Sequence, residues 1–165
     1  MSAILILGID PGLNRCGWGV VASEGSRLSH VAHGVVTPNA TLSLAERLCG
    51  LIEGLEEVIA QWRPHEASIE ETFVNSNARA ALTLGQARGV TLAACARARL
   101  VVAEYSPATI KKALVGTGSA EKDQVAFMVR RLLPTAGAVS ADAADALAAA
   151  LCHAAHGGFR RRAGG

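Results

Sequence analysis

The sequence has no hydrophobic run long enough to cross a membrane, and its N-terminus lacks the charged segment and cleavage site of a secretory signal. It also has no internal repeat and no low-complexity linker. Its four cysteines follow neither a zinc-binding spacing nor the framework of a secreted disulfide-rich domain. We therefore expect a cytoplasmic protein with buried, reduced cysteines, built as one domain over residues 1–158 with a flexible basic tail at 159–165.

A large net charge is absent as well. The formal charge is only +2 over 165 residues, so global charge does not indicate a nucleic-acid-binding protein. Half of the residues are hydrophobic, which excludes a disordered chain. A local excess of basic residues lies between Lys111 and Arg131 and is compatible with phosphate contacts. An ordinary solvated surface accounts for these residues equally well.

Hydrophobic runs predict the strands of a mixed α/β sheet. The run from Ile4 to Ile9 is continuously apolar, as in a strand that is covered on both faces. Two more strands, at 18–21 and 28–36, are joined by a short polar turn, which favours antiparallel pairing. Shorter strands are expected at 67–69 and 100–103. Because strands come first and then alternate with helices, the pattern predicts a sheet with three antiparallel strands at one side.

Helices are expected between the later strands and at the C-terminal end. Ser43 and Glu46 form a capping box before an amphipathic run, and Asn77 is expected to cap a helix that continues to about Arg97. The remaining helices are expected from Pro107 to Leu114, after a cap at Ser119, and from Ser140 or Asp142 to the pair Gly157-Gly158.

Small residues follow one stripe of the helix that begins after Asn77. Ala81, Gly85, Gly89 and Ala93 are spaced four apart. Each interior glycine costs about 1 kcal/mol of helix stability relative to alanine, so a close neighbour is expected to offset the loss. That neighbour is either the protein's own sheet or a second copy of the chain.

Four carboxylates stand in settings that disfavour charge. Asp10 and Glu70 each follow an apolar run, while Asp142 and Asp145 interrupt an alanine-rich helix and share one of its faces. Carboxylates that meet in a fold repel one another unless a cation neutralises them. Oxygen ligands suit Mg²⁺ or Mn²⁺, and two such ions can hold a phosphodiester for in-line hydrolysis. A metal-dependent nuclease is therefore the first hypothesis.

Each carboxylate also has a simpler interpretation. Asp10 before Pro-Gly is a common turn residue, and Asp142 near a helix start is a common cap. Glu70 and Glu71 point to opposite faces of a strand, and either one alone is typically a solvated surface residue. The joint occurrence of the four acids is what favours the metal site.

Five segments carry a resemblance to a known family. They are Gly8–Gly12 (GIDPG), Ile69-Glu70 with Phe73, Leu84–Gly89 (LGQARG), Gly116–Lys122 (GTGSAEK) and Ala141–Leu147 (ADAADAL). In this order the chain resembles, over nearly its whole length, the bacterial RuvC-type resolvase of four-way (Holliday) DNA junctions. GIDPG alone also occurs in other ribonuclease-H-like nucleases and in actin-like ATPases.

The resemblance implies an α/β, ribonuclease-H-like fold, with a five-stranded mixed sheet whose first three strands are antiparallel and which helices flank. It also implies a homodimer, two Mg²⁺ ions per active site with Mn²⁺ as a substitute, and paired symmetric nicking of junctions in homologous recombination and DNA repair. A branch-migration motor of the RuvA and RuvB type is the implied partner.

The same resemblance assigns roles to individual residues. The catalytic and metal-binding acids would be Asp10, Glu70, Asp142 and Asp145. Lys111 and Lys122 would lie near the scissile phosphate, whereas the neighbouring Lys112 is interpreted as a surface residue. Phe73 would unstack bases at the crossover, although a core position is the simpler alternative, and Arg79 would contact the DNA backbone. The family sometimes has histidine where this chain has Asp145.

Three rival functions stay open at the sequence level. The first is a related ribonuclease-H-like nuclease that acts on RNA or on other DNA structures. The second is a binding module that recognises junctions without cutting them, against which the four carboxylates argue. The third is an actin-like ATPase, but 165 residues are few for two such lobes, and no second phosphate loop is apparent.

Overall fold

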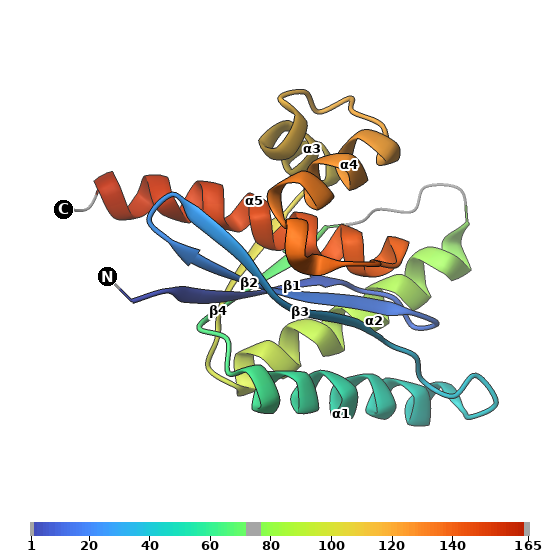
Figure 1. The fold of residues 1–165 in the computed structure, drawn as a ribbon. Coiled ribbons are helices and arrows are strands. Elements are labelled where there is room, and N and C mark those ends of the chain that lie inside the picture. Colours follow the sequence, from blue (N-terminus) through green and yellow to red (C-terminus); the bar gives the residue numbers. More distant parts are fainter. Residues whose placement is uncertain (1, 72–76, 164–165) are drawn as a thin grey trace.

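A five-stranded mixed sheet forms the middle layer of the molecule (Figure 1). The computed structural model describes the backbone of residues 2–71 and 77–163 and the side chains of residues 2–71 and 77–157. The strands are β1 (Ile4–Asp10), β2 (Cys16–Glu24), β3 (Arg27–Val36), β4 (Glu66–Glu70) and β5 (Val101–Tyr105), in the order β3-β2-β1-β4-β5. The first three are antiparallel, and β4 and β5 run parallel to β1. The predicted fold class is confirmed.

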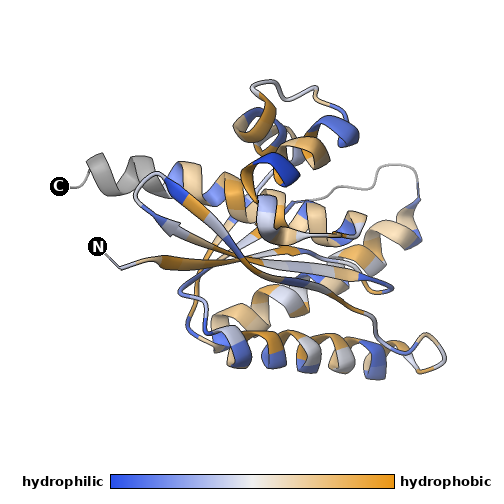
Figure 2. Ribbon diagram, viewed as in Figure 1, coloured by the Kyte–Doolittle hydropathy of each residue, from blue (hydrophilic) through white to orange (hydrophobic). Residues whose placement is uncertain are grey.

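Helices cover both faces of this sheet (Figure 1). On one face lie α1 (Leu44–Trp62) and α2 (Ala78–Arg97), and on the other lie α3 (Pro107–Val115), α4 (Lys122–Leu132) and α5 (Ala141–Ala163). A short 3-10 turn, Pro134–Ala136, precedes α5. Each face has its own hydrophobic core, and the start of β1 is among the most hydrophobic parts of the ribbon (Figure 2). Because β1 is central, its apolar residues contribute to both cores.

The predicted helix starts are mostly correct. The Ser43–Glu46 capping box is present, and the side chain of Asn77 caps α2. At α5 the hydroxyl of Ser140 accepts a hydrogen bond from the backbone of Ala143 at 3.3 Å, so Ser140 and not Asp142 occupies the capping position. The cap predicted at Ser119 is wrong, because α4 begins at Lys122 after Glu121.

The predicted end of α5 is also wrong. The helix continues through Gly157 and Gly158 to Ala163. A glycine favours a helix end through its access to the left-handed conformation, but it can also adopt helical geometry at a modest cost in stability. The flexibility predicted for residues 159–165 stays a prediction, since their side chains lie outside the described part of the chain.

Glycines on the sheet bring α5 into direct contact with β1 and β2. A Cβ atom on Gly8 would overlap the backbone carbonyl of Ala146, and one on Gly17 would overlap the carbonyl of Asp142. A Cβ atom on Gly19 would overlap the side chain of Leu147. Residues with side chains at these positions would hold the helix away from the sheet. The glycines therefore set the height at which α5 carries its two aspartates above the end of β1.

The small-residue stripe of α2 is not packed inside the protein. A Cβ atom on Gly85 or Gly89 would meet no heavy atom within 4 Å outside the helix's own backbone in the described structure. Nearby on the same helix, Leu82 is 64% exposed. The alternative in which the glycines pack on the protein's own sheet is therefore wrong.

The cysteines form no disulfide, and three of the four are buried. The expectation that all of them are buried is wrong for Cys49, which is exposed on α1. Burial raises the pKa of Cys16 and of Cys152 to about 12, so these thiols stay protonated near neutral pH. In the described part of the chain, no helix is long and apolar enough to span a membrane.

Candidate active site

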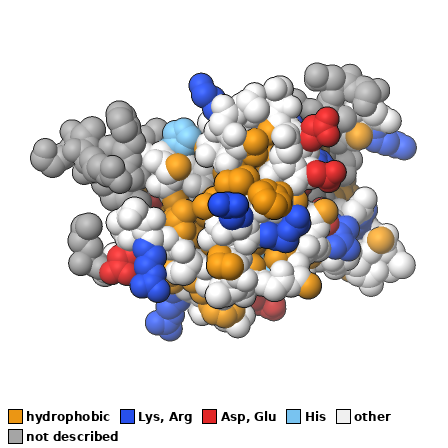
Figure 3. Space-filling model, turned by 45° about the horizontal axis from the view of Figure 1, so that its top comes forward, with side chains coloured by type: hydrophobic (Ala, Val, Ile, Leu, Met, Phe, Trp, Pro, Cys, Tyr) orange, Lys and Arg blue, Asp and Glu red, His pale blue; other side chains and the backbone are white. Residues whose placement is uncertain are grey.

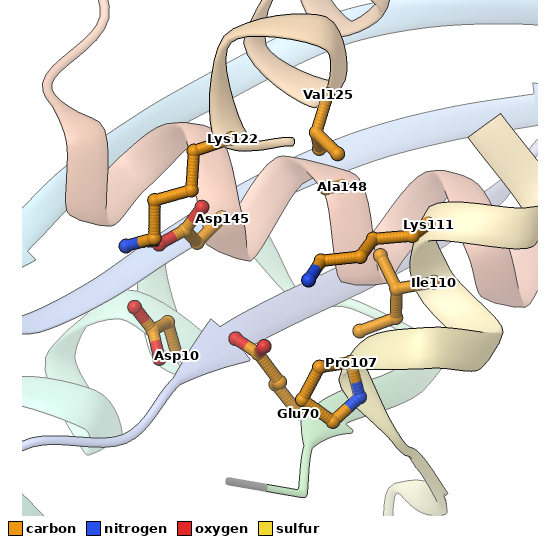
Figure 4. A pocket seen from close by; sticks show the side chains of 9 residues that line it. All are labelled: Asp10, Glu70, Pro107, Ile110, Lys111, Lys122, Val125, Asp145 and Ala148. Carbon is orange, nitrogen blue, oxygen red and sulfur yellow. Dashed lines mark ion pairs between the residues drawn. The ribbon is translucent and has the colours of Figure 1, made fainter. Parts of the chain in front are cut away.

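Three of the four predicted carboxylates meet at one edge of the sheet. Asp10 ends β1 and Glu70 ends β4, and the two strands pair in parallel with Ile9 opposite Ile69, so both acids emerge at the same edge. Asp145 reaches this edge from the second turn of α5. Together they line a pocket of about 390 Å³ (Figure 4).

Crowding raises the pKa values of these acids. Burial, together with the charges of Glu70, Asp145 and Asp142 and a hydrogen bond that protonated Asp10 donates to Glu70, raises the pKa of Asp10 to about 8. Burial is also the main reason that the pKa values of Glu70 and Asp145 lie above their ordinary range, although Lys122 and Lys111 partly oppose this effect. Ionised together, these groups repel one another. The site therefore favours either a bound proton or a bound cation.

Asp142 lies next to this pocket but does not line it. Its Oδ2 atom instead accepts a hydrogen bond at 2.7 Å from Nε of Arg15, which lies on the loop between β1 and β2. Arg15 is a residue whose contact the sequence analysis did not foresee, because its partner lies 127 positions away. Among the described residues, no three His, Cys, Asp or Glu side chains already stand in an arrangement that could hold a metal ion.

Both predicted active-site lysines line the pocket (Figure 4). Lys111 extends from α3, and Lys122 is the first residue of α4, with its Nζ atom 3.7 Å from Oδ2 of Asp145. Lys112 is exposed and is not among the residues that line the pocket, as its interpretation as a surface residue requires. Lys122 thus contacts one carboxylate of the site directly, and Lys111 lines the same pocket, so two cations stand beside the carboxylates where a phosphate can enter.

The rest of the pocket wall is hydrophobic. Pro107 and Ile110 of α3, Val125 of α4 and Ala148 of α5 complete it. Apolar walls exclude water from between the charged groups and strengthen their electrostatic interactions. On the face made by α3, α4 and α5, Lys and Arg side chains lie among hydrophobic ones (Figure 3).

Glu71 points away from the pocket, as the strand alternation predicts. One of its carboxylate oxygens lies 3.9 Å from Nη2 of Arg88 on α2, and Arg88 also pairs with Glu104 of β5. The backbone amide of Glu71 donates a hydrogen bond to the carbonyl of Tyr105 at 2.8 Å. These contacts fix the chain directly after Glu70. Arg88 belongs to the LGQARG segment, but its two partners were not foreseen from the sequence.

The two predicted DNA-contacting residues outside the pocket differ in their status. Phe73 lies outside the described residues. Arg79 is exposed in the first turn of α2, where its backbone amide donates a hydrogen bond at 2.9 Å to the capping side chain of Asn77. Its position leaves the guanidinium accessible to a ligand.

The donor set fits divalent metal ions. Four carboxylates offer only oxygen atoms, which Mg²⁺ and Mn²⁺ prefer, and their mutual repulsion is the electrostatic condition that a bound cation relieves. Asp10 interacts electrostatically with Glu70, Asp145 and Asp142, so it is close to all three of the other acids. Asp142 would be the fourth acid of this set, and its Oδ2 is paired with Arg15 in this structure.

Comparison with known proteins identifies relatives over most of the chain. Residues 6–153 match the family described as crossover junction endodeoxyribonuclease RuvC. The protein with this name from Caulobacter vibrioides is 59% identical over 149 residues, covering 90% of this chain and 88% of the relative. The one from Hyphomonas neptunium is 56% identical over 155 residues, covering 94% of this chain and 93% of the relative.

Solved structures agree with these relatives. The chain is similar to Thermus thermophilus RuvC in complex with a Holliday junction substrate, with a TM-score of 0.88, 34% identity and coverage of 95% and 96% of the two chains. The yeast mitochondrial Holliday junction resolvase Ydc2 shares the fold, with a TM-score of 0.62 at 14% identity, 94% of this chain and 82% of that chain. With its fold, its carboxylate pocket and these relatives in agreement, the chain belongs to the RuvC family of crossover junction endodeoxyribonucleases.

Proposed function

We propose that this protein resolves four-way DNA junctions by paired, symmetric, metal-dependent nicks. The observation that carries the proposal is the pocket in which Asp10, Glu70 and Asp145 face Lys111 and Lys122. Carboxylates opposite cations suit a phosphodiester held between metal ions and ammonium groups. The family membership supplies the substrate class, since the Thermus thermophilus relative is described in complex with a Holliday junction.

Each side chain has a distinct task in this reaction. Asp10, Glu70, Asp142 and Asp145 would hold two Mg²⁺ ions, for which Mn²⁺ is a substitute. When bound, these ions supply an activated water molecule and stabilise the leaving 3′-oxygen. Lys122 and Lys111 would hold the non-bridging oxygens of the scissile phosphate as point charges. The apolar wall of the pocket excludes bulk water from the reacting groups.

Outside the pocket, Phe73 and Arg79 are proposed to contact the junction. An aromatic ring stacks on unpaired bases, and a guanidinium contacts phosphate oxygens. Both residues follow β4 in the chain and so lie after the strand that ends at Glu70. The exposure of Arg79 at the start of α2 supports this proposed contact.

We propose that two copies of the chain act together. Two equivalent pockets related by a two-fold axis can cut two opposed strands of a symmetric junction. The stripe of Gly85 and Gly89 offers a surface for the second copy, because side chains that small allow two helices to approach closely. Leu82 at 64% exposure adds apolar area to the same helix.

A branch-migration motor of the RuvA and RuvB type is proposed as a further partner. The proposed location is the cytoplasm, where chromosomal DNA is the substrate.

Cleavage of a synthetic four-way junction tests the proposed function. The substrate carries a mobile crossover with randomised sequence, beside a linear duplex of matched sequence and an RNA–DNA hybrid. We expect symmetric paired nicks in the junction alone, with Mg²⁺ and not with chelator. Asp10→Asn and Asp142→Asn should abolish the nicks, whereas Asp123→Asn, which changes an exposed acid outside the pocket, should cut at the wild-type rate.

The alternatives predict other outcomes. Tight junction binding without any cut by wild-type protein would support the binding module instead. Cleavage of the hybrid in preference to the junction would support a different ribonuclease-H-like nuclease. Products from Asp10→Asn at the wild-type rate would remove the carboxylate pocket from the mechanism.

A further inference from the structure

Arg15 lies on a loop that contacts two other elements at once. The loop follows Asp10 directly, and its residue Leu13 is buried in the core with 5% exposure. Asn14 accepts a hydrogen bond from the guanidinium of Arg47 on α1. Arg15 donates through Nε to Asp142 on α5. The loop is therefore held at Leu13 and Asn14 beside the carboxylate pocket, and the side chain of Arg15 is directed at one of the proposed metal ligands.

Asp142 differs from Asp145 in where its carboxylate points. The two residues share a helix face, and yet only Asp145 lines the pocket. The backbone of Asp142 has little freedom, because its carbonyl lies directly over Gly17 of β2. The side-chain torsions of Asp142 are therefore what can vary, and the hydrogen bond from Arg15 sets them.

We propose that Arg15 is a positioning residue that competes with a divalent metal ion for the carboxylate of Asp142. The inference rests on the proposed metal site and goes beyond it, because it assigns a role to a residue that does not line the pocket. The bond to Arg15 occupies Oδ2, one of the two carboxylate oxygens that Asp142 can offer to a metal ion, and it directs the carboxylate toward Arg15. A guanidinium next to the site also repels a divalent cation. Binding of a divalent ion at the carboxylate of Asp142 would therefore compete with the pair.

The competition is weak enough to be reversible. The side chain of Arg15 is 54% exposed and that of Asp142 is 32% exposed, so solvent screens their attraction. Exposed pairs of this kind contribute little to stability, which corresponds to an effect on metal affinity of about two- to fivefold. Replacing the guanidinium should therefore tighten metal binding at low ionic strength, and added salt should reduce the difference.

Mn²⁺ binding to the protein without DNA tests this proposal. Electron paramagnetic resonance of free Mn²⁺ gives the dissociation constant for wild type, Arg15→Gln, Arg15→Lys and Arg97→Gln. Arg97 is the matched control, because it also forms an exposed ion pair, with Glu56 at 3.4 Å, away from the pocket. We expect Arg15→Gln to bind Mn²⁺ about two- to fivefold more tightly than wild type. Arg15→Lys keeps the charge and should stay within about twofold of wild type, as should Arg97→Gln.

Unchanged or weaker Mn²⁺ binding by Arg15→Gln would overturn the proposed competition. An equal increase in the Mn²⁺ affinity of Arg97→Gln would overturn it as well. Asp10→Asn, measured in the same way, separates this failure from failure of the proposed site. If Asp10→Asn binds as tightly as wild type, the carboxylate pocket is not the metal site and both proposals fall. If Asp10→Asn loses binding while Arg15→Gln matches wild type, only the role of Arg15 falls. Thermal unfolding of each variant checks that it is folded.

Discussion

The acids in and beside the pocket differ in the charged groups that surround them. Asp10 is buried among acids that raise its pKa, whereas Asp145 has Lys122 at 3.7 Å to offset the same burial. Asp142, beside the pocket, forms an ion pair with Arg15. Each acid thus has a different partner, and Asp10 has no cation among the causes of its shift. Stability and metal affinity should consequently depend most on Asp10.

The raised pKa of Asp10 makes the stability of the protein depend on pH when divalent ions are removed by chelator. Between the ordinary aspartate pKa and about pH 8, Asp10 is ionised in the unfolded chain but keeps its proton in the folded protein. The free energy of unfolding of wild type therefore falls over this range. In Asp10→Asn the side chain at position 10 cannot ionise, so the free energy of unfolding does not fall for this reason. Urea denaturation at pH 5.5 and pH 8.5 should show the stability of Asp10→Asn relative to wild type growing by about 3 kcal/mol.

The matched control for this prediction is Asp123→Asn, which removes an exposed carboxylate. Its stability relative to wild type should change little between the two pH values. If the free energy of unfolding of Asp10→Asn relative to wild type were the same at both pH values, the folded protein would not hold a proton on Asp10.

Lys111 and Lys122 line the pocket, whereas Lys112, the neighbour of Lys111 in the sequence, does not. Lys111→Met removes a charge that the proposed mechanism places at the scissile phosphate, while keeping an aliphatic chain of similar length. We expect junction cleavage under saturating Mg²⁺ to slow by about 10- to 100-fold, as when one group that stabilises a transition state is lost. Lys112→Met should cut within about twofold of wild type. Equal losses in both variants would indicate general phosphate attraction by the surface instead.

At the scale of elements, the packing of α5 on the sheet decides where the aspartates stand. Ser68 of β4 donates a buried hydrogen bond at 2.7 Å to the carbonyl of Ala149, and Gly8 and Gly17 allow contact with the helix backbone. Further along the same two elements, His153 lies 2.6 Å from Glu66. These contacts fix the helix along its length over β4, so Asp145 comes to lie at the end where Glu70 is.

A methyl group on Gly17 should disturb this arrangement. In Gly17→Ala the new Cβ would overlap the carbonyl of Asp142, and only a shift of the backbone relieves the overlap. We expect the free energy of unfolding to fall by about 1–3 kcal/mol and junction cleavage to fall in the folded fraction as well. Urea denaturation and cleavage assays measure the two effects.

Gly50→Ala is the matched control for Gly17→Ala. Gly50 lies on α1, and among the residues that the structure describes a Cβ atom there would meet the side chain of Pro38 at 3.7 Å, an ordinary contact. The higher helix propensity of alanine should stabilise this variant by about 0.5–1 kcal/mol without changing cleavage. A stable, fully active Gly17→Ala protein would mean that α5 does not depend on this close contact.

At the scale of the whole molecule, the exposed stripe on α2 is the feature that the single chain leaves unexplained. In the described part of the chain, a Cβ atom on Gly85 or Gly89 would meet no atom beyond the helix's own backbone, so these glycines cost helix stability without packing in return. The proposed second copy of the chain supplies the missing contact. It would also give the two-fold symmetry that paired nicking requires.

Gly89→Arg tests the proposed dimer. A large charged side chain at this position has open space in the single chain but would clash in a close helix–helix contact. We expect sedimentation velocity to change from dimer to monomer, paired nicking to be lost, and the circular dichroism spectrum to stay that of the wild type. Gln61→Arg, which adds the same charge at an exposed position of α1, should remain dimeric. A dimeric Gly89→Arg protein would place the interface elsewhere.

The sequence by itself determined what depends on neighbouring residues. Runs such as Ile4–Ile9 predict strands, and Ser43 and Asn77 cap the helices that follow them. Asp10 and Glu70 each end a strand, and the structure brings them together because those strands are parallel neighbours. Local signals were weaker at helix ends, where Glu121 replaced Ser119 as the cap and α5 continued past Gly158.

Only the tertiary structure decided contacts between distant positions. Arg15 and Asp142 are 127 residues apart, and nothing in the pattern around either one specifies the other. The helix position of Asp142 suggested that it would join Asp145 in the pocket, but a hydrogen bond from another element turned it away. The stripe of Gly85 and Gly89 has the same helical spacing whether it packs inside or faces outward. Spacing fixes which face of an element a residue occupies, and the packing of the elements decides what that face meets.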